Sequence, residues 1–109
     1  MTRKCECAVV STTVADESAA ADLAGRAVEA RLAACAHIAP IRSVYRWKGV
    51  VERDSEVSLR FKTMPDRAED LVAFIRSNHS YELPEILVER AEASPDYLAW
   101  VKVETSSNG

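Results

Sequence analysis

The sequence predicts a single mixed α+β domain in which strands and helices alternate along the chain. Two-residue alternation and runs of β-branched residues indicate strands over 5–13, 35–63 and 86–88. Between them, apolar residues recur at three- and four-residue spacing, which is typical of helices packed on one side. The chain has 109 residues, of which 48% are apolar and 28% charged, and this composition suits one globular domain.

The first strand is expected over residues 5–13 (CECAVVSTT), which are rich in β-branched side chains. A helix should follow, because Asp16 and Glu17 are acidic residues of the kind that favour a helix N-terminus. Its buried stripe is expected to consist of Ala20, Leu23, Ala24, Ala27, Val28 and Leu32. Many of these positions are alanine, so the helix can lie close to a sheet.

Residues 35–63 predict a long hairpin with its bend at Gly49. Pro40 predicts that the first strand bends or lies at a sheet edge. Side chains two apart share a strand face, so we expect one apolar face and one largely basic face. The apolar face would hold Tyr45, Trp47, Val57, Leu59 and Phe61, and the basic face Arg42, Arg46, Lys48, Arg60 and Lys62, with Ser58 among them.

The second half of the chain repeats the pattern of helix and strand. Residues 64–66 (MPD) should end the hairpin and begin a helix with Thr63 as its cap. After a loop over 80–85, the continuous apolar run at 86–88 predicts a strand covered on both faces. Ser94 and Pro95 begin a last helix, anchored by Tyr97, Leu98, Trp100 and Val101.

We therefore expect one domain over 5–104, followed by a polar tail over 105–109. Two βαβ units joined by a hairpin fold into a four-stranded antiparallel sheet with both helices on one face. This is the ferredoxin-like βαββαβ sandwich, here with a C-terminal helix. Val9 and its neighbours Ala8 and Val10 place apolar side chains on both faces of the first strand, so a second copy is expected to cover the other face.

Charge and composition exclude several classes of partner. The formal net charge of −3 argues against nucleic acid, which selects a basic surface. No stretch is long and apolar enough to suggest a membrane span or a signal peptide, so we expect a cytoplasmic protein. Cys5, Cys7 and Cys35 are too few for a disulfide scaffold and are expected to be thiols.

Several ordered stretches resemble one family over residues 8–101. They are residues 16–17 (DE), 30–35 (ARLAAC), 43–49 (SVYRWKG), 54–56 (DSE), 61–63 (FKT), 78–79 (NH) with Tyr81, 84–85 (PE) and 97–100 (YLAW). In this order and at these distances they resemble the CutA divalent-cation tolerance proteins. The resemblance implies a homotrimer similar to the PII signalling proteins, with sheets packed inward and helices outward. It also implies a role in tolerance to copper and other divalent cations.

The resemblance implies a metal site at three positions of this chain. In some bacterial members a cysteine at the end of the first strand and two adjacent histidines bind copper. Thr12 stands at the cysteine position, Asn78 at the first histidine and His79 at the second. His79 is therefore the expected metal ligand. Weak binding of Cu(II) or another divalent cation is expected, since tight sites use three or four ligands.

A candidate pocket groups Tyr81 and Glu85 with His79, and Lys62 is expected nearby. The alternative is that His79 caps the second helix while Tyr81 fills a subunit seam. Large aromatic residues are favoured at interfaces, so Tyr45, Trp47 and Trp100 are predicted to lie at the contact between subunits.

Two smaller patterns involve cysteine. Cys5 and Cys7 share a strand face and could bind Cu(I) as a thiolate pair, or simply be structural. Cys35 and His37 also share a face, and we expect Cys35 to be buried and His37 to be hydrogen-bonded.

The chain carries no glycine-rich phosphate loop, nucleophile elbow or metalloprotease spacing, so no enzyme is expected. Two function classes remain. One is a metal-tolerance protein, and the other is a PII-like trimeric module that binds a small molecule or a partner.

Overall fold

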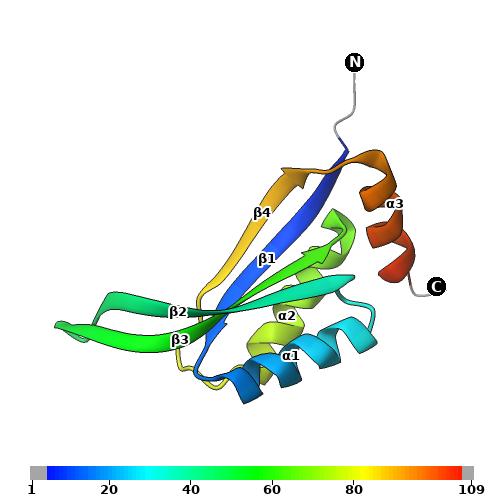
Figure 1. Cartoon of the computed structure of the whole chain (residues 1–109). Coiled ribbons are helices and arrows are strands. Elements are labelled where there is room, and N and C mark those ends of the chain that lie inside the picture. Colours follow the sequence, from blue (N-terminus) through cyan, green and yellow to red (C-terminus); the bar gives the residue numbers. More distant parts are fainter. Residues whose placement is uncertain (1–4, 107–109) are drawn as a thin grey trace.

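A computed structural model describes residues 5–106. The elements are β1 (Glu6–Val14), α1 (Glu17–Glu29), β2 (Cys35–Trp47), β3 (Val50–Thr63), a 3-10 turn (Pro65–Arg67), α2 (Ala68–Asn78), β4 (Ile86–Glu92) and α3 (Pro95–Glu104). The strands form one antiparallel sheet in the order β2-β3-β1-β4. Helices α1 and α2 cover one face of this sheet (Figure 1). The predicted element order is confirmed.

The hydrophobic core lies between this face and the two helices. Strand β1 contributes alternate residues, among them Ala8, Val10 and Val14, because side chains two apart point to the same side. Strand β3 contributes Val57, Leu59 and Phe61, and the helices contribute Ala20, Leu23, Ala24, Ala27, Ala68, Leu71 and Ile75. We call the opposite sheet face, which α1 and α2 do not cover, the open face.

The start of α1 follows the expected sequence signal, and its end is closed by a residue with a positive φ. The Asp16 carboxylate accepts the Ala19 N–H at 2.8 Å and caps the first turn. At the other end Arg31 has a φ of 60° and closes the helix with a left-handed residue. Its guanidinium lies 3.6 Å from the carboxylate of Glu104, which ties this end of α1 to α3.

The β2–β3 hairpin extends beyond the helices as a long arm, at the left of Figure 1. Its turn consists of Lys48 and Gly49, whose φ angles are 50° and 83°. Two positive φ angles in succession are what a type I′ hairpin turn requires, and Gly49 adopts its angle without strain. The predicted bend at Gly49 is confirmed, and Pro40 lies on an edge strand as expected.

The prediction of a single apolar hairpin face is wrong. Tyr45 pairs with Glu52 and Trp47 with Val50, whereas Leu59 pairs with Ile38. Cross-strand partners share a face, and a two-residue turn pairs every odd-numbered residue with an even-numbered one. Tyr45 and Trp47 therefore belong to the open face, opposite the buried side chains of β3.

Thr63 does not cap the second helix. It is still part of β3, where it pairs with Ala8. The residue before the 3-10 turn is Met64, and no side chain caps either the turn or α2. The Thr63 hydroxyl is buried and has no hydrogen-bond partner within the described chain.

Strand β4 and the C-terminus also differ from expectation. Leu87 and Val88 are 52% and 49% exposed, so a single chain does not cover this strand on both faces, because β4 lies at the sheet edge. Thr105 is buried and donates its hydroxyl to the Val101 carbonyl, so the tail does not begin there. Residues 107–109 of the predicted tail lie outside the described residues.

Helix α3 packs against β1 and β3 at the end opposite the arm (Figure 1). Its Val101 is fully buried, and Cys7 and Val9 on the open face are only 3% exposed. Within residues 5–106, no helix has the length and apolar character needed to cross a membrane.

Candidate functional site

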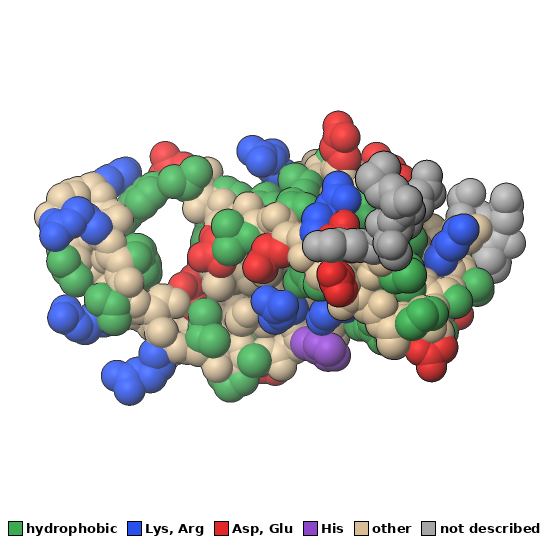
Figure 2. Space-filling view, turned by 90° about the horizontal axis from the view of Figure 1, so that it is seen from above, with side chains coloured by type: hydrophobic (Ala, Val, Ile, Leu, Met, Phe, Trp, Pro, Cys, Tyr) green, Lys and Arg blue, Asp and Glu red, His purple; other side chains and the backbone are tan. Residues whose placement is uncertain are grey.

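A groove of about 830 Å³ lies between the β2–β3 arm and the segment that joins α2 to β4. From above, the arm at the left is separated from the body of the molecule by an opening (Figure 2). The arm and β1 side of the groove is lined by Thr13, Arg42, Ser43, Val44, Tyr45, Arg46, Trp47 and Glu56, and the loop side by Ser80, Tyr81, Glu82, Leu83 and Glu85. The groove thus combines aromatic rings with charges of both signs.

Tyr81 connects the two sides of this groove. Its hydroxyl donates to the Glu56 Oε2 at 2.8 Å, and its ring centroid lies 4.9 Å from that of His79. Burial raises the pKa of Tyr81 above its usual value, and the hydrogen bond to the Glu56 carboxylate raises it further. The contact holds the loop against the arm.

A second phenol and carboxylate pair lies on the arm itself. The Tyr45 hydroxyl donates to Asp54 Oδ2 at 2.5 Å. This hydrogen bond raises the pKa of Tyr45 to about 12. Sequence reasoning named Tyr45 and Tyr81 but missed these two acidic partners. The sequence pattern that could have revealed these partners is the alternation of Glu52, Asp54 and Glu56. It places all three on one face of β3, the face that Tyr45 shares through its pairing with Glu52.

All three tyrosines are expected to ionise well above pH 10 in the folded protein. The pKa values of Tyr45 and Tyr97 are raised to about 12, and that of Tyr81 is also raised. A raised folded-state pKa means that the folded chain holds the proton more tightly. The contribution to stability is complete below the unfolded pKa of about 10 and is lost as the pH rises through the folded pKa.

Tyrosinate absorbance measured against pH checks this prediction. The chain in denaturant should titrate near pH ~10, as free tyrosine does. The native chain should stay protonated there and titrate together with alkaline unfolding. A native midpoint equal to that in denaturant would contradict the two hydrogen-bonded pairs.

His79 joins β1, α2 and the groove loop. It directly follows α2, and its Nε2 lies 2.8 Å from the Thr13 carbonyl oxygen and 3.1 Å from the Thr12 hydroxyl. Its Nδ1 accepts the Tyr81 N–H at 3.1 Å, so the hydrogen of the neutral ring is on Nε2 and is donated to β1. His79 therefore follows the helix as a capping residue would, but its ring contacts the neighbouring strand instead of helix carbonyls.

The structure brings together most of the predicted pocket residues but not all. Tyr81 and Glu85 line the groove, as do Tyr45 and Trp47. Lys62 does not, because β3 places it opposite Cys35, at the end of the hairpin far from the turn.

The profile of the family described as CutA1 divalent ion tolerance protein matches residues 8–104. The chain belongs to the CutA1 divalent ion tolerance protein family. The expected family is therefore confirmed.

Individual CutA proteins agree with this assignment. Protein CutA of mouse is 42% identical over 97 residues, which are 87% of this chain and 55% of the mouse protein, so the chain spans about half the length of that relative. CutA of Synechococcus elongatus superposes with a TM-score of 0.90 at 40% identity, covering 96% of this chain and 95% of that one. CutA1 of Oryza sativa superposes with a TM-score of 0.88 at 35% identity, covering 95% and 97%. These structures confirm the PII-like α+β fold.

The three positions at which the resemblance implies copper ligands do not offer a set of free donors in this chain. Thr12 and His79 are adjacent, but each is already hydrogen-bonded to the other. The Asn78 amide accepts from Arg26 at 2.9 Å and donates to the Phe74 carbonyl at 2.8 Å. A hydroxyl, an amide and an imidazole with both nitrogens occupied do not fit copper, which favours free imidazole and sulfur ligands.

The remaining candidates are spread over the molecule. In the described range 5–106, no three His, Cys, Asp or Glu side chains group in a way that could hold a metal ion. Cys5 is exposed and Cys7 buried, so the two thiols do not share one environment. Cys35 is half-buried, not fully buried as expected, and its Sγ lies 3.5 Å from the Tyr97 hydroxyl. His37 is hydrogen-bonded, to Lys62.

Trp100 lies on α3 beside Tyr97, with ring centroids 5.6 Å apart, and is 42% exposed. It lines a smaller pocket with Val28 and Arg31. It therefore lies far from the groove that Tyr45 and Trp47 line.

Proposed function

We propose that this CutA1 protein acts in divalent-cation tolerance as a homotrimer. The observation that carries the proposal is the placement of two exposed apolar surfaces at opposite ends of an elongated chain. One lies on the arm and includes Tyr45 and Val50, and the other lies on α3 and includes Trp100 and Val103. The chain extends over 48 × 31 × 21 Å, which separates the two surfaces.

Both apolar surfaces would be buried by a head-to-tail contact, in which the arm of one copy packs against α3 of the next. Contacts of this kind close into rings when the rotation between copies allows it. Leu87 and Val88, which are exposed on edge strand β4, add apolar surface that a contact between copies could bury. Tyr45, Trp47 and Trp100 are proposed to lie at this contact.

Copper binding in this proposal is weak. The side chains at the family ligand positions do not offer a set of free donors, and an incoming ion would compete with the hydrogen bonds of His79. The tolerance role is therefore proposed not to depend on tight copper storage by a single chain.

The groove favours a second candidate function. A PII-like module that binds a small molecule would use such a site, which has three aromatic rings beside carboxylate and guanidinium groups. This function is compatible with tolerance, because a sensor can act on cation levels through a metabolite or a partner.

A cytoplasmic location is also proposed. All three cysteines are free thiols, as is usual in a reducing compartment. Cell fractionation of the native host with an antibody to the chain would test it, and recovery with secreted proteins would contradict it.

Light scattering and calorimetry test the main proposal. We expect a mass near three times the 12.0 kDa chain mass at micromolar concentration. A mass near 12.0 kDa would exclude the trimer. Calorimetric titration with Cu(II) and Zn(II) should show only weak heats, and tight stoichiometric Cu(II) binding would contradict the copper part. Deletion of the gene should increase sensitivity to divalent cations.

A further inference from the structure

One face of the β2–β3 arm is cationic. Tyr45 lies on the open face, so its neighbours in β2, Val44 and Arg46, lie on the opposite face of the arm. Their cross-strand partners in β3 are Arg53 and Val51. We call this surface the cationic arm face and define it by Arg42, Val44, Arg46, Val51 and Arg53, with Lys48 in the turn at its end.

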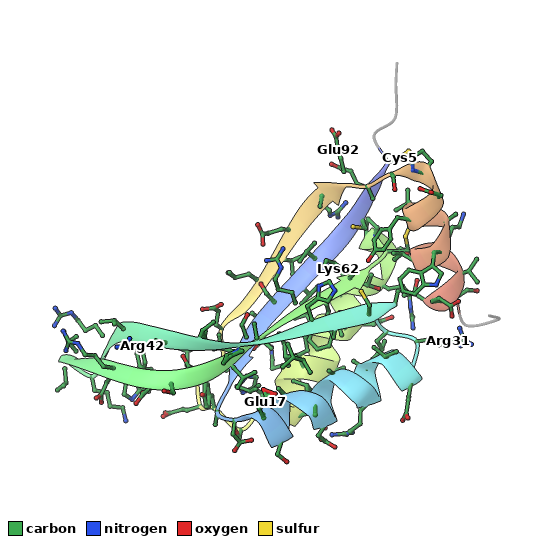
Figure 3. All side chains as sticks on the ribbon, viewed as in Figure 1. Cys5, Glu17, Arg31, Arg42, Lys62 and Glu92 are labelled. Atoms are coloured by element: carbon green, nitrogen blue, oxygen red, sulfur yellow. The ribbon has the colours of Figure 1, made fainter. Side chains whose placement is uncertain are left out.

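The cationic arm face is exposed to solvent in a single chain. The arm extends beyond α1 and α2, and Figure 3 labels Arg42 on this extended part of the hairpin. All four basic side chains of the face are exposed, and Val44 and Val51 are 65% and 43% exposed. Figure 2 shows Lys and Arg side chains around the end of the arm.

The proposed trimer does not cover this face. Contact between copies is assigned to Tyr45, Trp47 and Val50, which lie on the open face of the arm. The two faces of a hairpin point in opposite directions. A copy that packs against the open face therefore leaves the cationic arm face on the outside of the assembly.

The positive charge of this face is not neutralised within the chain. The acidic residues of the arm all lie on the open face, and they are Glu52, Asp54 and Glu56. Among residues 5–106, none of the four basic side chains of the cationic arm face forms an ion pair. The Arg46 guanidinium lies 3.5 Å from the Gly49 carbonyl, and Lys48 lies over the Trp47 ring, but neither contact supplies a full negative charge.

Arginine and valine alternate on this face, both along each strand and across the pair. Val44 is opposite Arg53, and Arg46 is opposite Val51. Side chains on one face of a strand repeat about every 6.6 Å, and an extended segment that lies along the arm repeats its own side chains at the same distance. Such a segment can place carboxylates beside the guanidinium groups, which bind them through two parallel hydrogen bonds, and apolar side chains beside the valines.

We propose that the cationic arm face binds an extended acidic segment of a partner protein. Aspartate or glutamate side chains of the segment pair with Arg42, Arg46 and Arg53, while its apolar side chains cover Val44 and Val51. This interaction goes beyond cation tolerance and the small-molecule groove, and it depends on neither. It gives the protein an outward surface through which a partner can be recruited.

An anionic membrane is the competing occupant. A membrane is a wide surface, so it also faces the rest of a chain whose net charge is −3, and that charge repels it. A single segment lies on the arm alone, where charges more than about 8 Å away are screened at physiological salt. The cationic arm face is only two strands wide, which suits a segment better than a bilayer.

Fluorescence anisotropy of the intact protein with a labelled peptide, in which glutamates alternate with leucine and serine, tests the proposal. The parent should bind this peptide at low ionic strength, and added salt should weaken the binding. Arg53→Gln should weaken the affinity by about two- to fivefold, the usual range for an exposed ion pair. A triple variant that adds Arg42→Gln and Arg46→Gln should weaken it by about tenfold or more.

Three controls show where and how the peptide binds. Arg42 and Arg46 also line the groove but Arg53 does not, so an effect of Arg53→Gln reports on the arm face and not on the groove. Arg76→Gln removes an exposed arginine of α2 and should bind the peptide as the parent does. A peptide with glutamine in place of every glutamate should not bind.

Three outcomes would overturn the proposal. One is that the acidic peptide binds the triple variant as well as it binds the parent, or binds neither. Another is that the parent sediments with phosphatidylserine vesicles while the triple variant does not, which would make the occupant a membrane. The third is that the triple variant has a lower mass in light scattering, which would show that a second copy covers this face. The mass of the parent is measured separately, so failure of this surface can be told apart from failure of the trimer.

Discussion

Trp100→Ala is expected to dissociate the proposed trimer and to lower the free energy of unfolding by about 3–5 kcal/mol per chain, the usual cost of truncating a buried aromatic residue. In a single chain Trp100 is 42% exposed, its ring lies beside that of Tyr97, and it lines a pocket together with residues at the end of α1. A large aromatic ring at such a place gains most of its stabilisation when a second surface covers it.

Light scattering and thermal unfolding, each followed against protein concentration, check this prediction. Trp100→Phe keeps a large ring and is the conservative control, which should retain the trimer. Trp47→Ala should also dissociate the trimer and lower its stability, because Trp47 lies on the arm beside the turn, at the opposite end of the molecule from Trp100. A Trp100→Ala trimer with unchanged melting temperature would show that the ring lies outside the contact.

The sequence predicts the element order because every element carries its own local signal. Asp16 caps α1, and Gly49 supplies a positive φ at the turn. The prediction of the face on which Tyr45 lies was wrong, because this face depends on the length of the hairpin turn. One residue more or fewer in the turn moves every side chain of the strand to the other face. Thr63 fails as a cap because long-range pairing with Ala8 keeps it in the strand.

The candidate site was predictable only in part. The sequence brings His79 and Tyr81 together because they lie two residues apart. It does not reveal that Thr13 and Glu56 would accept their hydrogen bonds, since these partners come from strands 66 and 25 residues away. Lys62 was placed with the wrong group for the same reason, because only the register assigns it to His37.

His79→Ala is expected to lower the free energy of unfolding by about 1–3 kcal/mol, the range for leaving a buried polar group without its partner. The buried Thr12 hydroxyl loses the imidazole at 3.1 Å, and the Thr13 carbonyl loses a donor at 2.8 Å. The Tyr81 N–H loses its acceptor as well, so the groove loop should loosen and the contact with Glu56 should weaken. The pKa of Tyr81 should then move down toward its ordinary value.

Denaturant unfolding and the tyrosinate titration measure these two effects. His37→Ala is the matched control, because it removes an exposed imidazole whose only hydrogen bond within the described chain is to Lys62, and it should change stability little. The same pair of variants shows whether His79 has a structural role or binds a metal ion. If His79 is chiefly structural, His79→Ala loses stability with no metal present, and Cu(II) fails to raise the melting temperature of the parent. A variant of unchanged stability that has lost copper binding would instead make His79 a metal ligand and contradict the structural role.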